Sequence, residues 1–379
     1  MNMQWNETQE MLRASAREFL SENYTRKSIR DARDSEQGLP ENLWTHMAEL
    51  GWLGLALPEV AGGSDMGFLD LCLLSEEMGY ACLPSPFNES IAGCGLVLAE
   101  TGAEQGLDSL RMLGLGESVI IPAFAGAYNN EGFLEFPHAT RDGDGFRIDG
   151  THLFVPHGAI ASSFLCLTQE DSSSDPALFL IPADGAGISL TALHSTRDDR
   201  PCRIDFTGVH APASALVSLG ERARILVHRA RQHMDVARCF DITGALTWVL
   251  EDTVAYARER RQFGQPIGSF QVLQHYCADM HIMLEGLRIS AYHAAWRMSD
   301  GLDADGAVAT TCAFAHQVVP RFLGMAHQVH GAMGVTIEHD LYLYSTHVSA
   351  PGAVLVPLSE YLEASLGFRP TGATTSDGL

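Results

Sequence analysis

One stretch in the second half of the chain carries three successive signals: the end of a helix, a tight turn and the start of a new helix. Apolar residues recur at helical spacing up to Tyr256, Gly264 and Pro266 interrupt the pattern, and a second helical pattern begins at Phe270. Several arginines gather before the turn, where a helix C-terminus favours positive charge. This stretch therefore predicts two helices joined by a short basic turn.

The polar residues of this turn have two possible roles. In one interpretation they form a solvated helix end, whose charges contribute little to stability. In the other they form an anion site, in which Arg260 and Gln262 offer hydrogen-bond donors to a pyrophosphate and Phe263 stacks on a ring. The residues by themselves leave both interpretations open.

Helical periodicity dominates both ends of the chain. Asn6 followed by Gln9 predicts a capping box at the start of the first helix. Pro320 should bend the helix in which it lies. The expected helices cover 6–23, 40–51, 68–80, short segments up to about 112, 222–262, 270–299 and 305–330. Their apolar stripes are typical of packing seams, which predicts a helical bundle at the C-terminal end.

Between the two helical parts, short β-strands separated by turn signals are expected. Asp142-Gly143 and Asp144-Gly145 are hairpin-turn pairs. The expected strands lie at 119–124, 146–148, 153–155, 164–167, 177–181 and 203–206. Such spacing predicts a small antiparallel β-domain.

The order of helices, strands and helices indicates an α+β protein. We place an N-terminal helical domain at 1–116, a middle β-domain at 117–215 and a C-terminal four-helix bundle at 216–366. A small, polar segment at 367–379 is expected to be a flexible tail.

Composition excludes several classes of partner. The formal charge of −23 argues against nucleic acid and anionic membranes, although a polyanionic cofactor depends only on local charge. No apolar run is long enough to span a bilayer, and the N-terminus lacks the layout of a signal peptide. The eight cysteines form no Cys-x-x-Cys pair, so we expect buried thiols in a cytoplasmic protein and no metal site.

Two segments carry a family resemblance. The run Y-A-x-E-R-x-Q-F-G-x-P-I-x-x-F-Q at 256–271 resembles the signature of the acyl-CoA dehydrogenase family. The run G-W-x-G-x-x-x-P-E-x-x-G-G at 51–63 is similar to the N-terminal motif of the same family. The resemblance covers nearly the whole chain. It implies the three-part layout expected above, an FAD cofactor, an acyl-CoA or other acyl thioester substrate, and an electron-transfer flavoprotein as electron acceptor.

The resemblance also assigns roles to residues of the basic turn. In the family this segment reaches across a subunit interface and holds the FAD of a neighbouring subunit. By match, Arg260, Gln262, Phe263 and Gln271 would take that role. A chain of this kind would work as an oligomer, either with copies of itself or with a sister chain.

A second cofactor contact is expected in the glycine-rich run at 328–334. Taken alone, this run is a helix C-cap. It also resembles the family's Q-x-x-G-G-x-G turn, where backbone groups approach the FAD pyrophosphate. Gln328, Gly331 and Gly334 match that turn, and Ala332 replaces its middle glycine at some cost in backbone freedom.

The β-domain departs from the family pattern. The run at 154–158 stands where the family usually has W-I-T-N-G, whose aromatic ring and hydroxyl contact the flavin. Phe154 could keep the ring contact, but Pro156 offers neither a hydroxyl nor a backbone N–H. The family's T-E-P segment, expected near 121–126, is not recognisable.

The catalytic base is a further departure. A carboxylate must take the α-proton of the substrate while the flavin takes the β-hydride. Most relatives have a glutamate at a position that falls near Leu355, where this chain has no carboxylate. Some relatives place it on the long helix, near Met234. Asp235 is therefore our first candidate and Asp241 our second, the alternative being that both are structural or surface carboxylates.

Three functions are compatible with this pattern. The first is an FAD-dependent acyl-CoA dehydrogenase with a displaced base, acting as a homo-oligomer. The second is a flavin-sharing, base-lacking subunit of a heteromeric acyl-CoA dehydrogenase. The third is a non-catalytic binding protein that kept the fold, since fold alone does not determine function.

Overall fold

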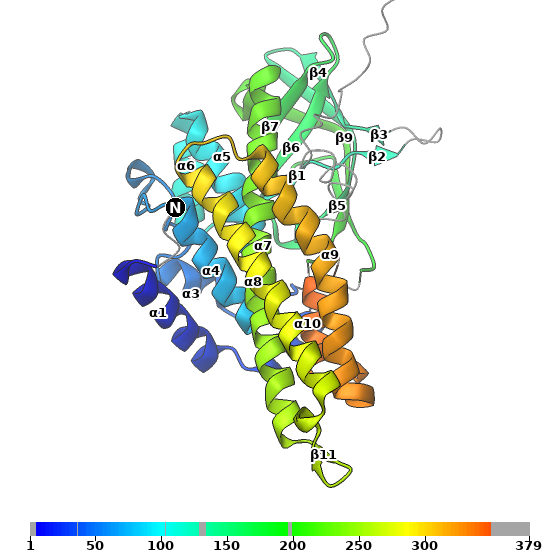
Figure 1. The fold of residues 1–379 in the computed structure, drawn as a ribbon. Coiled ribbons are helices and arrows are strands. Elements are labelled where there is room, and N and C mark those ends of the chain that lie inside the picture. Colours follow the sequence, from blue (N-terminus) through cyan, green and yellow to red (C-terminus); the bar gives the residue numbers. More distant parts are fainter. Residues whose placement is uncertain (1–4, 36, 103, 129–133, 196–198, 350–379) are drawn as a thin grey trace, which may run out of the picture.

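The computed structural model describes residues 5–35, 37–102, 104–128, 134–195 and 199–349. They form an N-terminal group of helices, a central sheet and a C-terminal group of long helices (Figure 1). This is the expected α+β architecture. The predicted tail at 367–379 and the position near Leu355 lie outside the described residues.

The N-terminal helices begin with the predicted capping box. The side chain of Asn6 accepts a hydrogen bond from the backbone N–H of Gln9, and the Gln9 side chain accepts one from the backbone N–H of Asn6. The elements are α1 (Glu7–Asn23), α2 (Arg26–Asp34), α3 (Leu43–Glu49), η1 (Glu59–Ala61), α4 (Phe68–Ala81), the π-helix η2 (Asn88–Gly95), α5 (Leu96–Thr101) and α6 (Glu104–Gly114).

Helix α2 was not predicted, because only Ile29 and Ala32 of its nine residues are buried and no apolar stripe marks it. Polar contacts hold it in place instead. Arg30 pairs with Asp340 at 2.7 Å, and Arg33 donates to the backbone oxygen of Leu343 at 2.9 Å. These contacts depend on residues about 310 positions away, so local sequence could not indicate them.

The central sheet is larger and more mixed than expected. Its strands are β1 (Ile120–Ala123), β4 (His138–Asp142), β5 (Gly145–Val155), β6 (Ser163–Glu170), β7 (Pro176–Pro182), β8 (Ile188–Ala192), β9 (Cys202–Pro212) and β10 (Leu216–Leu219). The order is β10-β7-β6-β4-β5-β9-β8, with β1 beside β6. The 3-10 turns η3 (Gly158–Ile160) and η4 (Ala213–Ala215) lie between strands, and β2 (Ala127–Tyr128) pairs with β3 (Leu134–Glu135).

The expectation of a purely antiparallel domain is wrong in one respect. Both β1 and β4 run parallel to β6, because the chain reaches β6 from each of them through a crossover and not through a tight hairpin. The other neighbouring strands of this sheet are antiparallel. The predicted hairpin turn lies between β4 and β5, where Gly143 has a φ of 61°. Strand β10 carries the sheet to Leu219, beyond the limit of 215 expected from the sequence.

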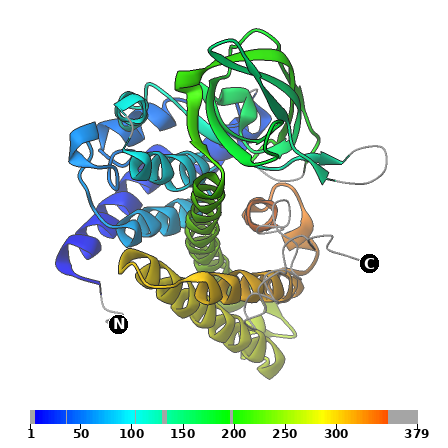
Figure 2. The same ribbon diagram turned by 90° about the horizontal axis from the view of Figure 1, so that it is seen from above.

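The C-terminal helices are organised around one long helix. They are α7 (Glu221–Glu259), α8 (Gln271–Ser299), α9 (Asp305–His330) and α10 (Asp340–Val348), with the 3-10 turns η5 (Ile267–Ser269) and η6 (Gly331–Val335). Helix α7 lies in the centre, with the N-terminal helices on one side, α8 and α9 on another, and the sheet on a third (Figure 2).

Two glycines let α4 and α7 approach closely. A Cβ on Gly79 would lie 1.8 Å from the backbone oxygen of Asp241, and one on Gly244 would lie 1.8 Å from that of Glu76. Any larger side chain would push the two helices apart. Because α4 and α7 carry residues of the cavities described below, this contact fixes the geometry there. Among the described residues, no helix is long and apolar enough to cross a membrane.

Candidate functional site

The basic turn predicted to hold a cofactor is a protruding β-hairpin. Helix α7 ends at Glu259, before the expected limit of 262, because β11 (Arg261–Gln262) pairs with β12 (Gln265–Pro266). Phe263 (φ 53°) and Gly264 (φ 82°) form the two-residue turn, as a type I′ hairpin requires. The hairpin lies at the end of α7 remote from the sheet (Figure 1).

The predicted contact residues of the hairpin face solvent. Phe263 is 91% exposed, which is unusual for an aromatic side chain. Arg260, Gln262 and Gln271 are exposed as well. Such an arrangement of guanidinium, amide and ring groups suits binding of an anion and a planar ring from outside the chain.

The glycine turn lies next to the base of this hairpin. His330 ends α9, and its ring stacks on Tyr256 at a centroid distance of 4.5 Å. Gly331 has a φ of 62°, and a Cβ on Gly334 would lie 2.8 Å from the Cβ of His330. Gln328 and Ala332 are exposed. Ala332 is not among the residues with positive φ, so its side chain is compatible with the turn.

A cleft lies between the sheet and α7. Its volume is about 870 Å³, which includes the solvent-filled space at its opening. Phe154 and Pro156 line it from β5 and the following turn, and Asp235 lines it from α7. Three predicted site residues are thus brought together. Pro122, Phe124 and Leu153 add an apolar wall that suits the face of a planar ring.

Phe154 has an unusual backbone conformation. Its φ is 54°, a left-handed value that costs energy for a bulky residue, and its side chain is 44% exposed. Two hydrogen bonds fix the facing segment. Arg231 donates to the backbone oxygen of Phe124 at 3.0 Å, and Nδ1 of the buried His152 lies 2.8 Å from the backbone oxygen of Ala125.

A buried ion cluster forms another wall of the cleft, and it was not anticipated from the sequence. Arg238 donates to Glu89 of η2 in a buried ion pair, with Asp199 and Asp235 close enough to interact with the same guanidinium. Burial disfavours the charged guanidinium, but the carboxylates of Glu89, Asp199 and Asp235 outweigh it and raise the pKa of Arg238. Burial likewise opposes the Glu89 carboxylate, but Arg238 and His157 lower its pKa overall. Both groups therefore stay charged at neutral pH.

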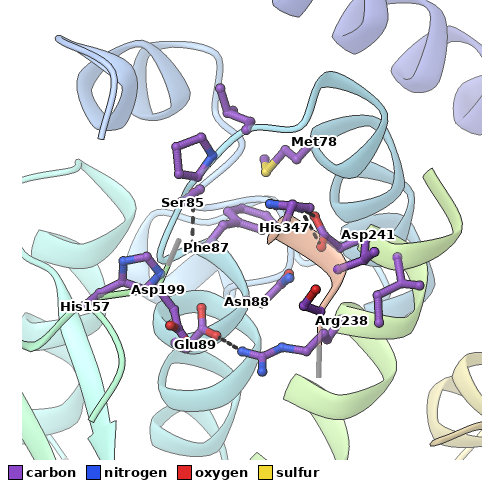
Figure 3. A pocket seen from close by; sticks show the side chains of 15 residues that line it. Met78, Ser85, Phe87, Asn88, Glu89, His157, Asp199, Arg238, Asp241 and His347 are labelled. Carbon is purple, nitrogen blue, oxygen red and sulfur yellow. Dashed lines mark hydrogen bonds and ion pairs between the residues drawn. The ribbon is translucent and has the colours of Figure 1, made fainter. Parts of the chain in front are cut away.

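Asp241 opens onto a different cavity, which has a volume of about 630 Å³ (Figure 3). Its carboxylate lies 3.0 Å from Nε2 of His347 on α10, and both side chains are largely buried. Three residues line both cavities: Glu89, Asp199 and Arg238. The ion pair between Glu89 and Arg238 therefore separates the two candidate acids, which the sequence could show only as neighbours on one helix.

Comparisons with known proteins identify related domains. A model of the acyl-CoA dehydrogenase N-terminal domain matches residues 6–107, and a model of the C-terminal domain of the same family matches residues 226–351. The acyl-CoA dehydrogenase FadE27 of Mycobacterium tuberculosis is 29% identical over 317 residues, covering 82% of this chain and 83% of that protein.

Solved structures show the same similarity. A chain of the ChsE4-ChsE5 complex from Mycobacterium tuberculosis superposes with a TM-score of 0.89 at 27% identity, covering 98% of this chain and 100% of that chain. A chain of a variant of the Tcur3481-Tcur3483 steroid ACAD gives a TM-score of 0.85 at 27% identity, with coverages of 96% and 97%. With the two domain models together matching more than half of its residues, the chain belongs to the acyl-CoA dehydrogenase family of flavoprotein oxidoreductases.

Proposed function

We propose that this chain is a flavin-sharing subunit of a heteromeric acyl-CoA dehydrogenase, in which a sister chain supplies the catalytic base. The observation that carries the proposal is the state of its two candidate acids. Asp241 is paired with His347, and Asp235 interacts with Arg238. A general base must reach the substrate proton with an available lone pair, which a carboxylate already engaged by another side chain offers poorly.

The position of the hairpin supports a shared cofactor. Arg260 lies 25 residues beyond Asp235, about 37 Å further along the same helix axis. A flavin in the cleft beside Asp235 is therefore out of reach of its own chain's hairpin. The exposed donors of Arg260 and Gln262 would serve the flavin of another chain.

The residues fit FAD in two separate half-sites. The apolar wall around Phe154 and Pro156 would pack against the flavin ring in one half-site. Arg260, Gln262 and the turn at Gly331 would bind the pyrophosphate in the other, with Phe263 and Gln271 beside it. When bound, FAD would supply the acceptor for the β-hydride of an acyl thioester. This chain would contribute binding, orientation and exclusion of water.

The solved relatives support the heteromeric assembly. The ChsE4-ChsE5 complex and the Tcur3481-Tcur3483 steroid ACAD each carry two component names. The second is described as a steroid ACAD, which makes a steroid acyl thioester the first substrate to assay. We further propose that an electron-transfer flavoprotein accepts the electrons and that the protein is cytoplasmic.

One observation favours a second candidate, a homo-oligomeric dehydrogenase with Asp235 as the base. Asp235 lines the same cleft as Phe154 and Pro156, so it could reach a substrate beside the flavin. The neighbouring Arg238 would keep it ionised, although at a cost in basicity.

Expression alone and together with a sister dehydrogenase chain separates these functions. We expect stoichiometric flavin and turnover only for the co-expressed pair, and turnover of the pair should survive Asp235→Asn. A yellow homo-oligomer whose turnover falls by orders of magnitude in Asp235→Asn would establish the second candidate instead. Absence of flavin and turnover in both preparations would indicate a binding protein on the same fold.

A further inference from the structure

Three ionisable side chains from distant parts of the sequence meet beside the glycine turn. They are Asp252 on α7, His330 at the end of α9 and His339, the N-cap residue of α10. One ligand atom of each, a ring nitrogen or a carboxylate oxygen, lies within 4.8 Å of the other two. Spacing along the chain gives no hint of this cluster, because it exists only where three helices end or pass together.

Two atoms of the cluster lack hydrogen bonds. The His330 side chain is completely buried, and its Nδ1 has no hydrogen-bond partner. Its Nε2 lies 3.2 Å from Oγ1 of Thr253, a hydroxyl that donates to the backbone oxygen of Val249, so Nε2 carries the proton and Nδ1 has the available lone pair. Oδ2 of Asp252 is also buried without a hydrogen bond, and it lies 3.6 Å from Nε2 of His330, beyond hydrogen-bonding distance. Buried polar atoms are normally satisfied, so these two indicate a missing partner at this position.

The third side chain is held ready by the backbone. Nδ1 of His339 accepts a hydrogen bond from the backbone N–H of Leu341 at 3.1 Å. Nδ1 is therefore occupied, and Nε2 is the nitrogen that carries the proton or binds a metal. The rings of His330 and His339 lie 4.8 Å apart between centroids in an edge-on arrangement. A fixed ring orientation is the usual device by which proteins prepare a histidine ligand.

We propose that Asp252, His330 and His339 form a zinc site. Two imidazoles and one carboxylate are a common ligand set for Zn²⁺, with water in the fourth position. Ligand atoms of a tetrahedral zinc ion lie about 3.3 Å apart, as follows from metal–ligand bonds of about 2.0 Å. One ligand atom of each of the three residues lies within 4.8 Å of the others, so side-chain rotations would bring the three atoms to this spacing.

Neighbouring cations do not take the place of the metal. Arg26 is the arginine that acts on Asp252 electrostatically, but it lies 3.8 Å from Asp340 and stacks on the rings of Trp248 and Tyr344 at 4.9 Å. His327 is hydrogen-bonded to Ser345 at 2.7 Å. The carboxylate oxygen of Asp252 thus remains directed at the two histidines.

A zinc ion here would join α7, α9 and α10 on both sides of the turn at Gly331 and Gly334. It would hold the turn in one conformation without touching a substrate. The site depends on residues of this chain only, so it is independent of which subunit supplies the base.

The test is titration of the untagged, chelator-treated protein with ZnCl₂ by calorimetry, in its purified assembly. We expect one zinc per chain and a rise in the melting temperature. His339→Ala and Asp252→Asn should each weaken binding by at least about 100-fold. His281→Ala, which removes an exposed histidine of α8, should leave binding unchanged.

The cobalt form provides a second readout. Co²⁺ at the site should show ligand-field absorption at wavelengths longer than the flavin band, and His339→Ala should abolish it. Folding of each variant is checked by circular dichroism, and His339 is the preferred position because it is less buried than His330. Binding at less than one zinc per chain, or equal binding by wild type and both ligand variants, would overturn the proposal.

Discussion

The hairpin at the C-terminal end of α7 and the cleft beside the middle of α7 use similar residues in opposite ways. Both contain arginines and both were matched to flavin contacts. In the hairpin, Arg260 and Gln262 are exposed and Phe263 is 91% exposed. In the cleft, Arg238 is buried and surrounded by carboxylates of its own chain.

This difference indicates where the groups that pair with each region's charges lie. Charges that a chain pairs internally stabilise its own fold only if the pairing is complete, because buried ions lose their hydration. Charges left in water remain available to another molecule. The hairpin is thus suited to act on a neighbour, whereas the cleft wall is suited to hold the sheet, η2 and α7 together.

The largest expected effect breaks the cleft wall. Arg238→Met should leave the buried carboxylate of Glu89 without its partner and reduce the free energy of unfolding by about 3–5 kcal/mol. Urea denaturation measures this. In the double variant with Glu89→Gln part of the stability should return, because the buried carboxylate is removed together with its partner while Asp199 and Asp235 still lose Arg238. Equal stability of Arg238→Met and wild type would show that the ion pair is not a structural element.

Acidification should act on the cleft and not on the hairpin. Burial lowers the pKa of His152, behind the cleft, to about 4 from 6.5. Its neutral form is favoured in the folded state, so its contribution is complete above pH 6.5 and is lost as the pH falls towards 4, by up to about 3 kcal/mol.

His233 has a pKa lowered to about 4 as well, also mainly by burial, and adds to this loss. Denaturation curves between pH 7.5 and 4.5 should therefore show proton uptake on unfolding. His152→Asn, which keeps a donor for the oxygen of Ala125, should reduce the uptake by about one proton. An unchanged pH dependence in this variant would contradict the assignment.

Substitutions in the hairpin should weaken flavin binding and leave the stability of the fold unchanged. Arg260→Ala removes a charge-assisted contact and should cost about 1.5–3 kcal/mol of flavin binding, a tenfold to hundredfold loss of affinity. Flavin titration of the assembled protein measures it. Arg258→Ala, an equally exposed arginine at a variable position of the motif, is the matched control. Equal losses in the two variants would show that only net charge matters.

The smallest effect concerns the turn itself. Gly264 has a φ of 82° and open space around it, so Gly264→Ala introduces backbone strain without a clash. We expect the free energy of flavin binding to weaken by about 1 kcal/mol, which is a several-fold loss of affinity. The melting temperature should be unchanged. Gly62→Ala, at a φ of 83° in open space far from the hairpin, should leave flavin affinity as in wild type.

Local patterns predicted most of the secondary structure. Residues 305–330 form a helix with the expected limits, and Asn6 and Gln9 make the expected capping box, because both signals involve neighbouring residues only. The family followed from the ordered motif at 256–271, and the domain models agree with it. By contrast, α2 and the parallel pairing of β1 with β6 depend on distant contacts, and neither was predicted.

The sequence by itself determined the fold class and the family and singled out the residues that we propose to contact a neighbouring subunit, because helical periodicity and a linear motif lie in consecutive residues. Only the tertiary structure decided which carboxylates meet which cations. Asp235 and Asp241 are six residues apart on one helix, yet Arg238 and Glu89 separate them into different cavities. Such pairings, like the meeting of Asp252 with His330 and His339, arise from the packing of elements that no local pattern connects.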